Sequence, residues 1–267
     1  MKNNLALLFA LAATNSLAQT PPGATCAGLP SQAQLKAALE AATLAEASGL
    51  NNHMWATLVN RDGVVCAVAF SGTDRGAQWP GSRVISAQKA NTANAFSLDA
   101  SSKSNGSGQA SGLALSTANL YSAVQPGGSL YGLQHSNPVD TDVAYGGAAA
   151  FYGTGLDPMV GQRIGGVNVF GGGLGLYAVG ERLVGGVGVS GDTSCADHNI
   201  AWRVRNNLRL DHLLGVGGVS GDPARPDNII FDITDNPFGG TGKSAGGFGH
   251  PTCINTAGSD TLPAVQK

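Results

Sequence analysis

The chain has 267 residues, of which only 12% are charged, and its formal net charge is −2. Soluble domains average about 25% charged residues, so this protein carries few ions for its size. Recognition of nucleic acid rests on a basic face, and the composition therefore argues against a nucleic-acid partner. The 40 glycines indicate a compact chain with many loops, and the length suits one large domain or two small ones.

The first 18 residues have the features of a secretory signal. A lysine at position 2 precedes an apolar run at 5–13, and residues 16–18 (SLA) have small side chains at the two positions that a signal peptidase reads. The apolar run is shorter than the roughly 20 residues that a membrane-spanning helix needs. We therefore expect cleavage before Gln19, a periplasmic or secreted protein, and no membrane span after cleavage.

Four cysteines are present, Cys26, Cys66, Cys195 and Cys253. An even number of cysteines in an exported chain predicts disulfides, and four cysteines allow three pairings. We favour Cys26–Cys66 with Cys195–Cys253, because each bond would tie a loop or a terminal tail to a regular element. No C-x-x-C spacing supports a zinc site.

The first half of the chain predicts helices and one hairpin. Ser31 is a suitable N-cap for a helix with an apolar stripe, and an Asp-Gly turn between apolar, β-branched runs predicts a hairpin. In chain order we expect a linker at 19–29, a helix at 31–49 and the two hairpin strands at 53–60 and 64–70. A helix at 82–96, a polar loop at 98–112 and a further helix at 113–124 follow.

The second half contains a glycine-rich stretch, in which 12 of the 31 residues at 161–191 are glycine. Apolar and aromatic residues alternate with these glycines, so the stretch predicts strands joined by tight turns. A helix follows, with Asp192 or Thr193 as its cap. We expect three strands at 166–170, 174–179 and 183–190, the helix at 196–208, and one later strand at 228–233.

Three stretches together resemble the haem-degrading domain family of GlcG and HbpS, which includes the C-terminal domain of PduO-type proteins. ATLVNRDGVVCAVAF (56–70) is similar to the family's hairpin, and RVISAQKANTANAF (83–96) is similar to its A-x-K-A-x-T-A helix. ERLVGGVGVSGDTSCADHNIA (181–201) is similar to its glycine-rich passage from strand to helix. Each motif alone is weak evidence for the family, whereas the three motifs in this order are fairly specific for it.

The resemblance implies an α+β sandwich, a mainly antiparallel sheet of about five strands with helices packed on it. Together with the expected signal and linker, it divides the chain into a signal peptide (1–18), a linker (19–29), the domain (30–210) and a C-terminal extension packed on the domain (211–267). The domain would hold an inserted loop region around 98–165. Relatives of this kind form symmetric oligomers, so we also expect a homo-oligomer.

Residues 186–191 (GVGVSG) match the dinucleotide fingerprint G-x-G-x-x-G, and Asp211 lies 20 positions after Gly191. That fingerprint belongs after the first strand of a parallel βαβ unit. Here it follows antiparallel hairpins, late in the domain. We therefore expect the glycines to let a neighbouring helix or subunit press close to the strand.

The resemblance also implies a haem site. Haem needs an apolar slot, groups that meet its propionates, and an axial ligand such as His, Tyr, Met or Cys; the two expected disulfides would occupy every cysteine. His135 is our first candidate for the metal ligand, with Tyr131, Tyr121 and Met159 in the same inserted region. The alternative for His135 is an ordinary histidine in a polar surface loop.

Two basic residues could meet an anionic group. Lys89 lies on a helix of small apolar residues and Arg83 on the first turn of the same helix, so either could neutralise a propionate or another small anion at the domain surface. The alternative for Lys89 is a buried stem with a solvated head. His198 and His212 are expected on a helix surface, and His250 in a loop.

No hydrolase or nucleotide motif is complete. Residues 86–89 match S-x-x-K, but the S-D-N and K-T-G elements that accompany it in β-lactamases do not occur. We therefore expect an exported haem-binding or haem-handling protein and leave open whether it has catalytic activity. The alternatives are a non-enzymatic oligomeric module for structure or assembly, and a periplasmic binder of another small anionic ligand.

Overall fold

The computed structural model describes residues 25–102, 111–240 and 242–267, so the expected signal peptide and most of the expected linker lie outside the described residues. Four antiparallel strands form the central sheet in the order β2-β1-β4-β3. They are β1 (Trp55–Asn60), β2 (Val65–Phe70), β3 (Gly173–Ala178) and β4 (Arg182–Ser190). Two sequence-local hairpins are joined by the pairing of β1 with β4. The predicted α+β class is confirmed.

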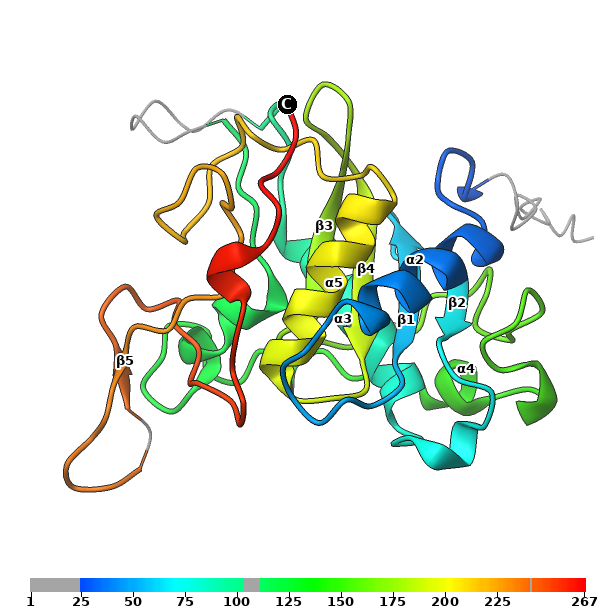
Figure 1. Ribbon diagram of the computed structural model, residues 1–267, viewed down its shortest axis with the longest axis horizontal. Coiled ribbons are helices and arrows are strands. Elements are labelled where there is room, and N and C mark those ends of the chain that lie inside the picture. Colours follow the sequence, from blue (N-terminus) through cyan, green and yellow to red (C-terminus); the bar gives the residue numbers. More distant parts are fainter. Residues whose placement is uncertain (1–24, 103–110, 241) are drawn as a thin grey trace, which may run out of the picture.

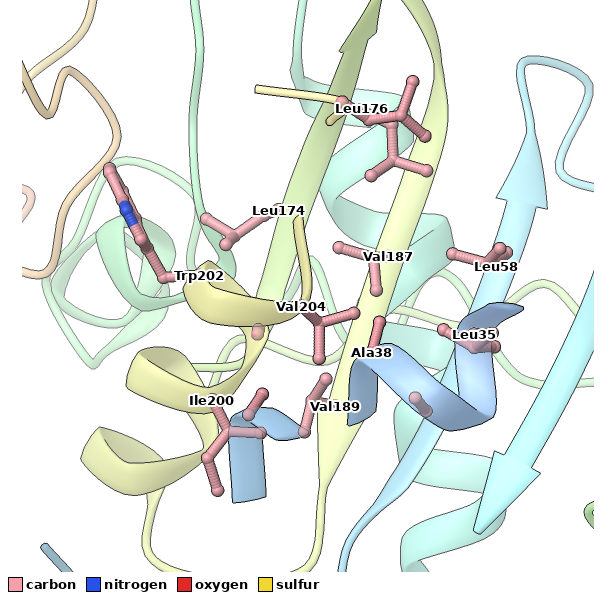
Figure 2. Close-up of a cluster of buried hydrophobic side chains, with 14 of the residues drawn as sticks. Leu35, Ala38, Leu58, Leu174, Leu176, Val187, Val189, Ile200, Trp202 and Val204 are labelled. Atoms are coloured by element: carbon pink, nitrogen blue, oxygen red, sulfur yellow. The ribbon is translucent and has the colours of Figure 1, made fainter. Parts of the chain in front are cut away.

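Helices cover both faces of this sheet (Figure 1). Helices α2 (Gln32–Leu44) and α5 (Ser194–Asn207) pack on one face, and α3 (Ser82–Phe96) packs on the other. Alternation along β1 assigns its side chains to two cores, because Leu58 joins the α2/α5 core whereas Trp55 joins the α3 core. Figure 2 shows Leu58 and its neighbours from the sheet meeting Leu35 of α2.

The glycines of β4 let α3 approach the sheet backbone to backbone. A Cβ atom on Gly188 would overlap the carbonyl oxygen of Ser86, and a Cβ on Gly186 would overlap that of Ala90. GVGVSG also runs through the middle of an antiparallel sheet, with β1 on one side and β3 on the other. The expectation of close helix packing is therefore correct, and the parallel βαβ unit that a dinucleotide fingerprint requires is not formed at this strand.

The sheet has four strands where five were expected, because 166–170 does not join it. Gly165 and Gly166 have φ of +63° and +80°, which breaks the extended backbone. The N–H of Asn168 donates to the side-chain oxygen of Thr92 (3.0 Å) rather than to a neighbouring strand. The strand expected at 228–233 is also wrong for most of its length, since only its last residue enters β5 (Ile233–Thr234), which pairs with β6 (Lys243–Ser244) in a separate sheet.

The helix expected at 113–124 is instead two 3₁₀ turns, at Thr117–Leu120 and Ser122–Val124. Polar side chains in this segment bond elsewhere: the Thr117 hydroxyl accepts from Gly173 N–H (2.8 Å), and the Asn119 amide donates to the Asn228 carbonyl (2.9 Å). Such bonds compete with a regular helix. The remaining short helices are α4 (Thr141–Tyr145) and 3₁₀ turns at Arg75–Ala77, Ala149–Phe151 and Ser259–Thr261.

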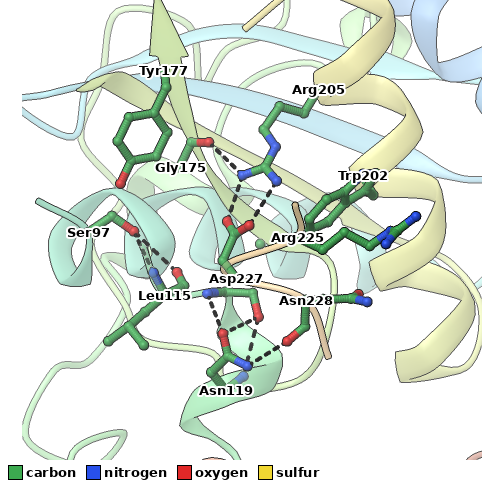
Figure 3. Close-up of polar contacts among 12 residues, drawn as sticks. Ser97, Leu115, Asn119, Gly175, Tyr177, Trp202, Arg205, Arg225, Asp227 and Asn228 are labelled. Atoms are coloured by element: carbon green, nitrogen blue, oxygen red, sulfur yellow. Dashed lines mark hydrogen bonds and ion pairs between the residues drawn. The ribbon is translucent and has the colours of Figure 1, made fainter. Parts of the chain in front are cut away.

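Residues 211–267 pack along α5 and the β3 edge. Leu213, Val216, Leu262 and Val265 join the α2/α5 core. The Asp227 carboxylate accepts two hydrogen bonds from the guanidinium of Arg205, at 2.6 and 2.9 Å, and the same guanidinium donates to the Gly175 carbonyl oxygen (Figure 3). This segment therefore supplies part of the hydrophobic core and the counter-ion of a buried arginine.

Both expected disulfides are present. Cys26–Cys66 ties the segment before α2 to strand β2, and Cys195–Cys253 ties the C-terminal segment to the first turn of α5. Among the described residues, no helix is both long enough and apolar enough to cross a membrane.

Candidate functional site

The residues expected to form the haem site do not gather in one place. His135 and Tyr131 are exposed on a loop, and Tyr131 keeps 64% of its surface accessible. Tyr121 packs its ring against His250, with 4.9 Å between the ring centroids. Met159 is fully buried in the α3 core. The 131–135 loop therefore presents His135 to solvent.

Lys89 is buried, not at the domain surface. Its Nζ lies 2.6 Å from Oδ2 of Asp197 and 3.1 Å from the Val189 carbonyl oxygen. The other oxygen of Asp197 accepts the N–H groups of Gly191 and Asp192. Burial lowers the pKa of Lys89 and raises the pKa of Asp197 to about 6, while the ion pair acts in the opposite direction on both. Lys89 thus holds α3 to the turn between β4 and α5.

Arg83 is also buried and paired, but it forms one wall of a cleft. Its guanidinium donates to both carboxylate oxygens of Asp157 (2.9 and 2.5 Å) and to the Ala144 carbonyl (2.8 Å). The same group lies 3.6 Å from the centroid of the Tyr152 ring. Asp157 is itself fixed by the N–H groups of Gly153 and Met159. The first turn of α3 is therefore locked to the inserted loop.

The cleft, which we call the Arg75 cleft, has a volume of about 500 Å³. It lies between the 73–81 loop and the inserted loop that follows α4. Its walls include Trp55, Arg75, Arg83, Val84, Tyr145 and Tyr152. Pockets of 300–1,000 Å³ with apolar walls and a few placed polar groups are typical small-molecule sites.

Arg75 gives this cleft an available positive charge. It is exposed, begins a 3₁₀ turn capped by Asp74, and lies 5.5 Å from the centroid of the Tyr152 ring. Within the described ranges it has no carboxylate partner, unlike Arg83. Tyr152 is held by its hydroxyl, which lies 2.9 Å from the Tyr145 carbonyl oxygen.

Three of the cleft's wall residues, Arg75, Tyr145 and Tyr152, were not anticipated from the sequence. Each lies in a loop or a one-turn helix, where no periodicity identifies a face. The one available signal is a charged residue in the sequence TDRGAQWPG (73–81), between a strand and a helix. Loops on a rigid scaffold often carry binding residues, but this rule does not say which distant loop will form the opposite wall.

The fold and the motifs agree with the sequence comparison. Residues 31–205 match the family described as haem degrading protein HbpS-like, and the chain belongs to that family. No curated protein matches the sequence.

Several solved structures are similar. One is a crystal structure of a PduOC:heme complex, with 23% identity, covering 66% of this chain and 89% of that chain, at a TM-score of 0.41. Another is Klebsiella pneumoniae protein ORFY, with 26% identity, 66% and 86% coverage, and a TM-score of 0.40. A third is a double mutant of Streptomyces reticuli HbpS, with 18% identity, 76% and 97% coverage, and a TM-score of 0.38.

The histidines are more buried than the sequence suggested. His198, expected on a helix surface, is fully buried, and its Nε2 lies 3.1 Å from Oδ1 of Asn228. His250, expected in a loop, lies in irregular structure but is buried against Tyr121. His212 is partly buried and contacts the Lys267 carbonyl oxygen through Nδ1. Burial lowers the pKa of His198 to about 4.

The free energy of unfolding is expected to fall as the pH drops from about 6.5 to 4. In that range His198 binds a proton in the unfolded chain and stays neutral in the folded chain. Its contribution to the free energy of unfolding is therefore present above pH 6.5 and lost toward pH 4. The loss is on the order of 3 kcal/mol. Denaturant unfolding at several pH values should give a flatter profile for His198→Gln, with His135→Gln as the exposed control. A folded-state NMR titration of His198 near pH 6.5 would contradict this expectation.

Proposed function

We propose that this protein binds haem in the Arg75 cleft, as an exported haem-binding or haem-handling protein. Membership of the HbpS-like family supports the ligand. The single observation that supports the location of the site is the Arg75 cleft itself, which has a volume of about 500 Å³, aromatic walls, and an arginine that has no carboxylate partner among the described residues. Export is supported by two disulfides, which persist in oxidising compartments.

The residues of the cleft fit the chemistry of a porphyrin. Tyr152 offers apolar ring surface, whereas Trp55 is only 2% exposed and contributes a small part of the wall. Trp55 is fixed by stacking on Phe70, with 4.6 Å between the ring centroids, and by the bond from its indole N–H to Gln78. Arg75 is placed to meet a propionate, since a guanidinium forms bidentate bonds with carboxylates. Arg83 already has its carboxylate in Asp157, so it stiffens the wall rather than binding a second anion.

Tyr145 is the residue of this cleft best placed to approach the iron. Tyrosine is one of the side chains that ligate haem iron. Tyr145 is 60% exposed, and its hydroxyl has no hydrogen-bond partner within the described ranges. The Tyr152 hydroxyl, by contrast, is occupied by two carbonyl oxygens. Bound haem would supply redox chemistry at its iron, and these side chains would hold and orient it.

Adding haem to the purified protein is expected to shift the Soret band and saturate at one haem per chain. Arg75→Ala should weaken haem binding about tenfold, because a charge-assisted hydrogen bond contributes about 1.5 kcal/mol. Tyr145→Phe should change the spectrum by removing the hydroxyl. Arg182→Ala is the matched control, since Arg182 is an exposed arginine at the start of β4 and not part of the cleft wall.

Two results would overturn the proposal in different ways. The absence of any Soret shift at stoichiometric haem would remove haem as the ligand. A shift that survives Arg75→Ala and Tyr145→Phe but is lost in His135→Ala would move the site to the exposed loop around His135. If haem does not bind and another small anion raises the melting temperature of the native protein but not of Arg75→Ala, the cleft binds that anion instead.

The homo-oligomer stays a prediction, which light scattering tests.

A further inference from the structure

The Cys195–Cys253 disulfide lies beside a buried histidine, and this group has the composition of a metal site. The two sulfurs and a ring nitrogen of His250 lie within 4.8 Å of one another. Two cysteines and one histidine are a ligand set that zinc accepts, with the fourth position left to water or a further ligand. This group lies at the N-terminus of α5, none of its residues is among those that line the Arg75 cleft, and the proposed haem function does not use it.

The hydrogen bonds of His250 leave one ring nitrogen with a lone pair that a cation could use. Its Nδ1 lies 2.6 Å from the Pro251 carbonyl oxygen, which assigns the ring proton to Nδ1 and leaves the lone pair on Nε2. Metal-bound histidines almost always donate their other N–H to such an acceptor. Nε2 now accepts from the Ser194 hydroxyl at 2.7 Å. A metal ion would take that lone pair in place of the serine proton.

The three ligands are held in place by contacts other than the disulfide. Cys195 lies on the first turn of α5, and its N–H points to Sγ of Cys253 at 3.1 Å. Cys253 is fixed by Thr256, whose hydroxyl accepts from the Cys253 N–H and donates to its carbonyl, both at 2.6 Å. The backbone N–H of His250 donates to the Ile230 carbonyl oxygen at 2.7 Å. These bonds would keep the ligands together after the sulfurs separate.

We propose that reduction of the Cys195–Cys253 disulfide turns this group into a binding site for a zinc-like divalent cation. A dithiol reductant transfers two electrons and two protons to the disulfide, the S–S bond breaks, and the reductant becomes a disulfide. Each cysteine thiol then loses its proton as its sulfur binds the cation, so one Zn²⁺ replaces two protons. Cys253 is partly exposed whereas Cys195 is buried, so the reductant would attack the Cys253 sulfur.

The consequence for the molecule is a change in what holds the C-terminal segment. In the oxidised protein a covalent bond joins 250–256 to α5, and in the reduced protein a metal ion would make that connection. The site would therefore report on the thiol redox state of its surroundings by exchanging a disulfide for bound metal.

Titration with Zn²⁺ alone, and with Co²⁺ as a coloured stand-in, tests this inference on the full chain before and after reduction by a phosphine. We expect no stoichiometric binding to the oxidised protein, one ion per reduced chain, and thiolate-to-cobalt absorption bands. Cys195→Ser/Cys253→Ser keeps the Cys26–Cys66 pair and should lose the site after the same reduction. His250→Ala should weaken binding at least tenfold, with circular dichroism and the melting temperature recorded for each variant.

Three outcomes would overturn it. The first is a reduced wild-type protein that stays folded and binds no ion. The second is equal binding by Cys195→Ser/Cys253→Ser, which would assign the ion to Cys26 and Cys66. The third is loss of the circular dichroism spectrum on reduction, which would show that the ligands do not stay together without the bond.

Discussion

Replacing Gly188 with alanine is expected to lower the free energy of unfolding by about 3 kcal/mol or more. The added methyl would overlap the carbonyl oxygen of Ser86 and the N–H nitrogen of Ala90, both of which are backbone atoms of α3. Backbone atoms cannot rotate away as a side chain can, so α3 or β4 must shift as a whole. Because α3 also contacts β1 and β3, that shift would disturb the packing of the whole face.

Urea unfolding measures this effect as a lower midpoint at unchanged slope. Gly155→Ala is the matched control, because Gly155 has no positive φ and a Cβ there would meet nothing within 4 Å. We expect its free energy of unfolding to change by less than about 0.5 kcal/mol. A Gly188→Ala protein as stable as Gly155→Ala would mean that α3 does not rest on the β4 backbone.

The parts of the fold that the sequence predicted correctly have strong local signals. The 61–63 turn, the Ser31 cap and the helical spacing of 82–96 each depend on a few neighbouring residues. The segments predicted wrongly depend on distant partners. Residues 166–170 are apolar enough for a strand, yet the N–H of Asn168 meets the side chain of Thr92 on α3, and the N–H of Phe170 meets the side chain of Asn168. No local pattern reveals such a partner.

The sequence did not show which of the candidate site residues already have partners, for a related reason. Lys89 and Arg83 were chosen as free cations, but each meets a buried carboxylate more than 70 residues away, Asp197 and Asp157. Sequence spacing cannot show that these charges are already neutralised. Arg75, which has no carboxylate partner among the described residues, begins a 3₁₀ turn in the 73–81 loop, and its aromatic neighbour Tyr152 lies more than 70 residues away in the sequence. A long-range pairing therefore decides which arginine can meet a ligand.

Replacing Asp227 with alanine is expected to lower the free energy of unfolding by about 3–5 kcal/mol, the largest single effect that we anticipate. Both partners of the Arg205–Asp227 pair are completely buried, and the guanidinium donates to the two carboxylate oxygens at 2.6 and 2.9 Å. Removing the carboxylate would leave a buried positive charge whose remaining partners among the described residues are the Gly175 carbonyl, which accepts one hydrogen bond, and the Trp202 ring, whose centroid lies 4.5 Å from the guanidinium carbon. Arginine does not lose its proton in proteins, so the charge cannot be relieved by titration.

The chain contains a matched exposed pair for comparison. Asp222 and Arg225 lie 2.8 Å apart, but their side chains are 43% and 22% exposed. Asp222→Ala should therefore cost no more than about 1 kcal/mol. The double variant Arg205→Met/Asp227→Leu should recover much of the stability lost in Asp227→Ala, because it removes the unpaired charge along with its partner. If the double variant is no more stable than Asp227→Ala, the loss comes from the packing of the C-terminal segment on α5, and the buried charge is not its cause.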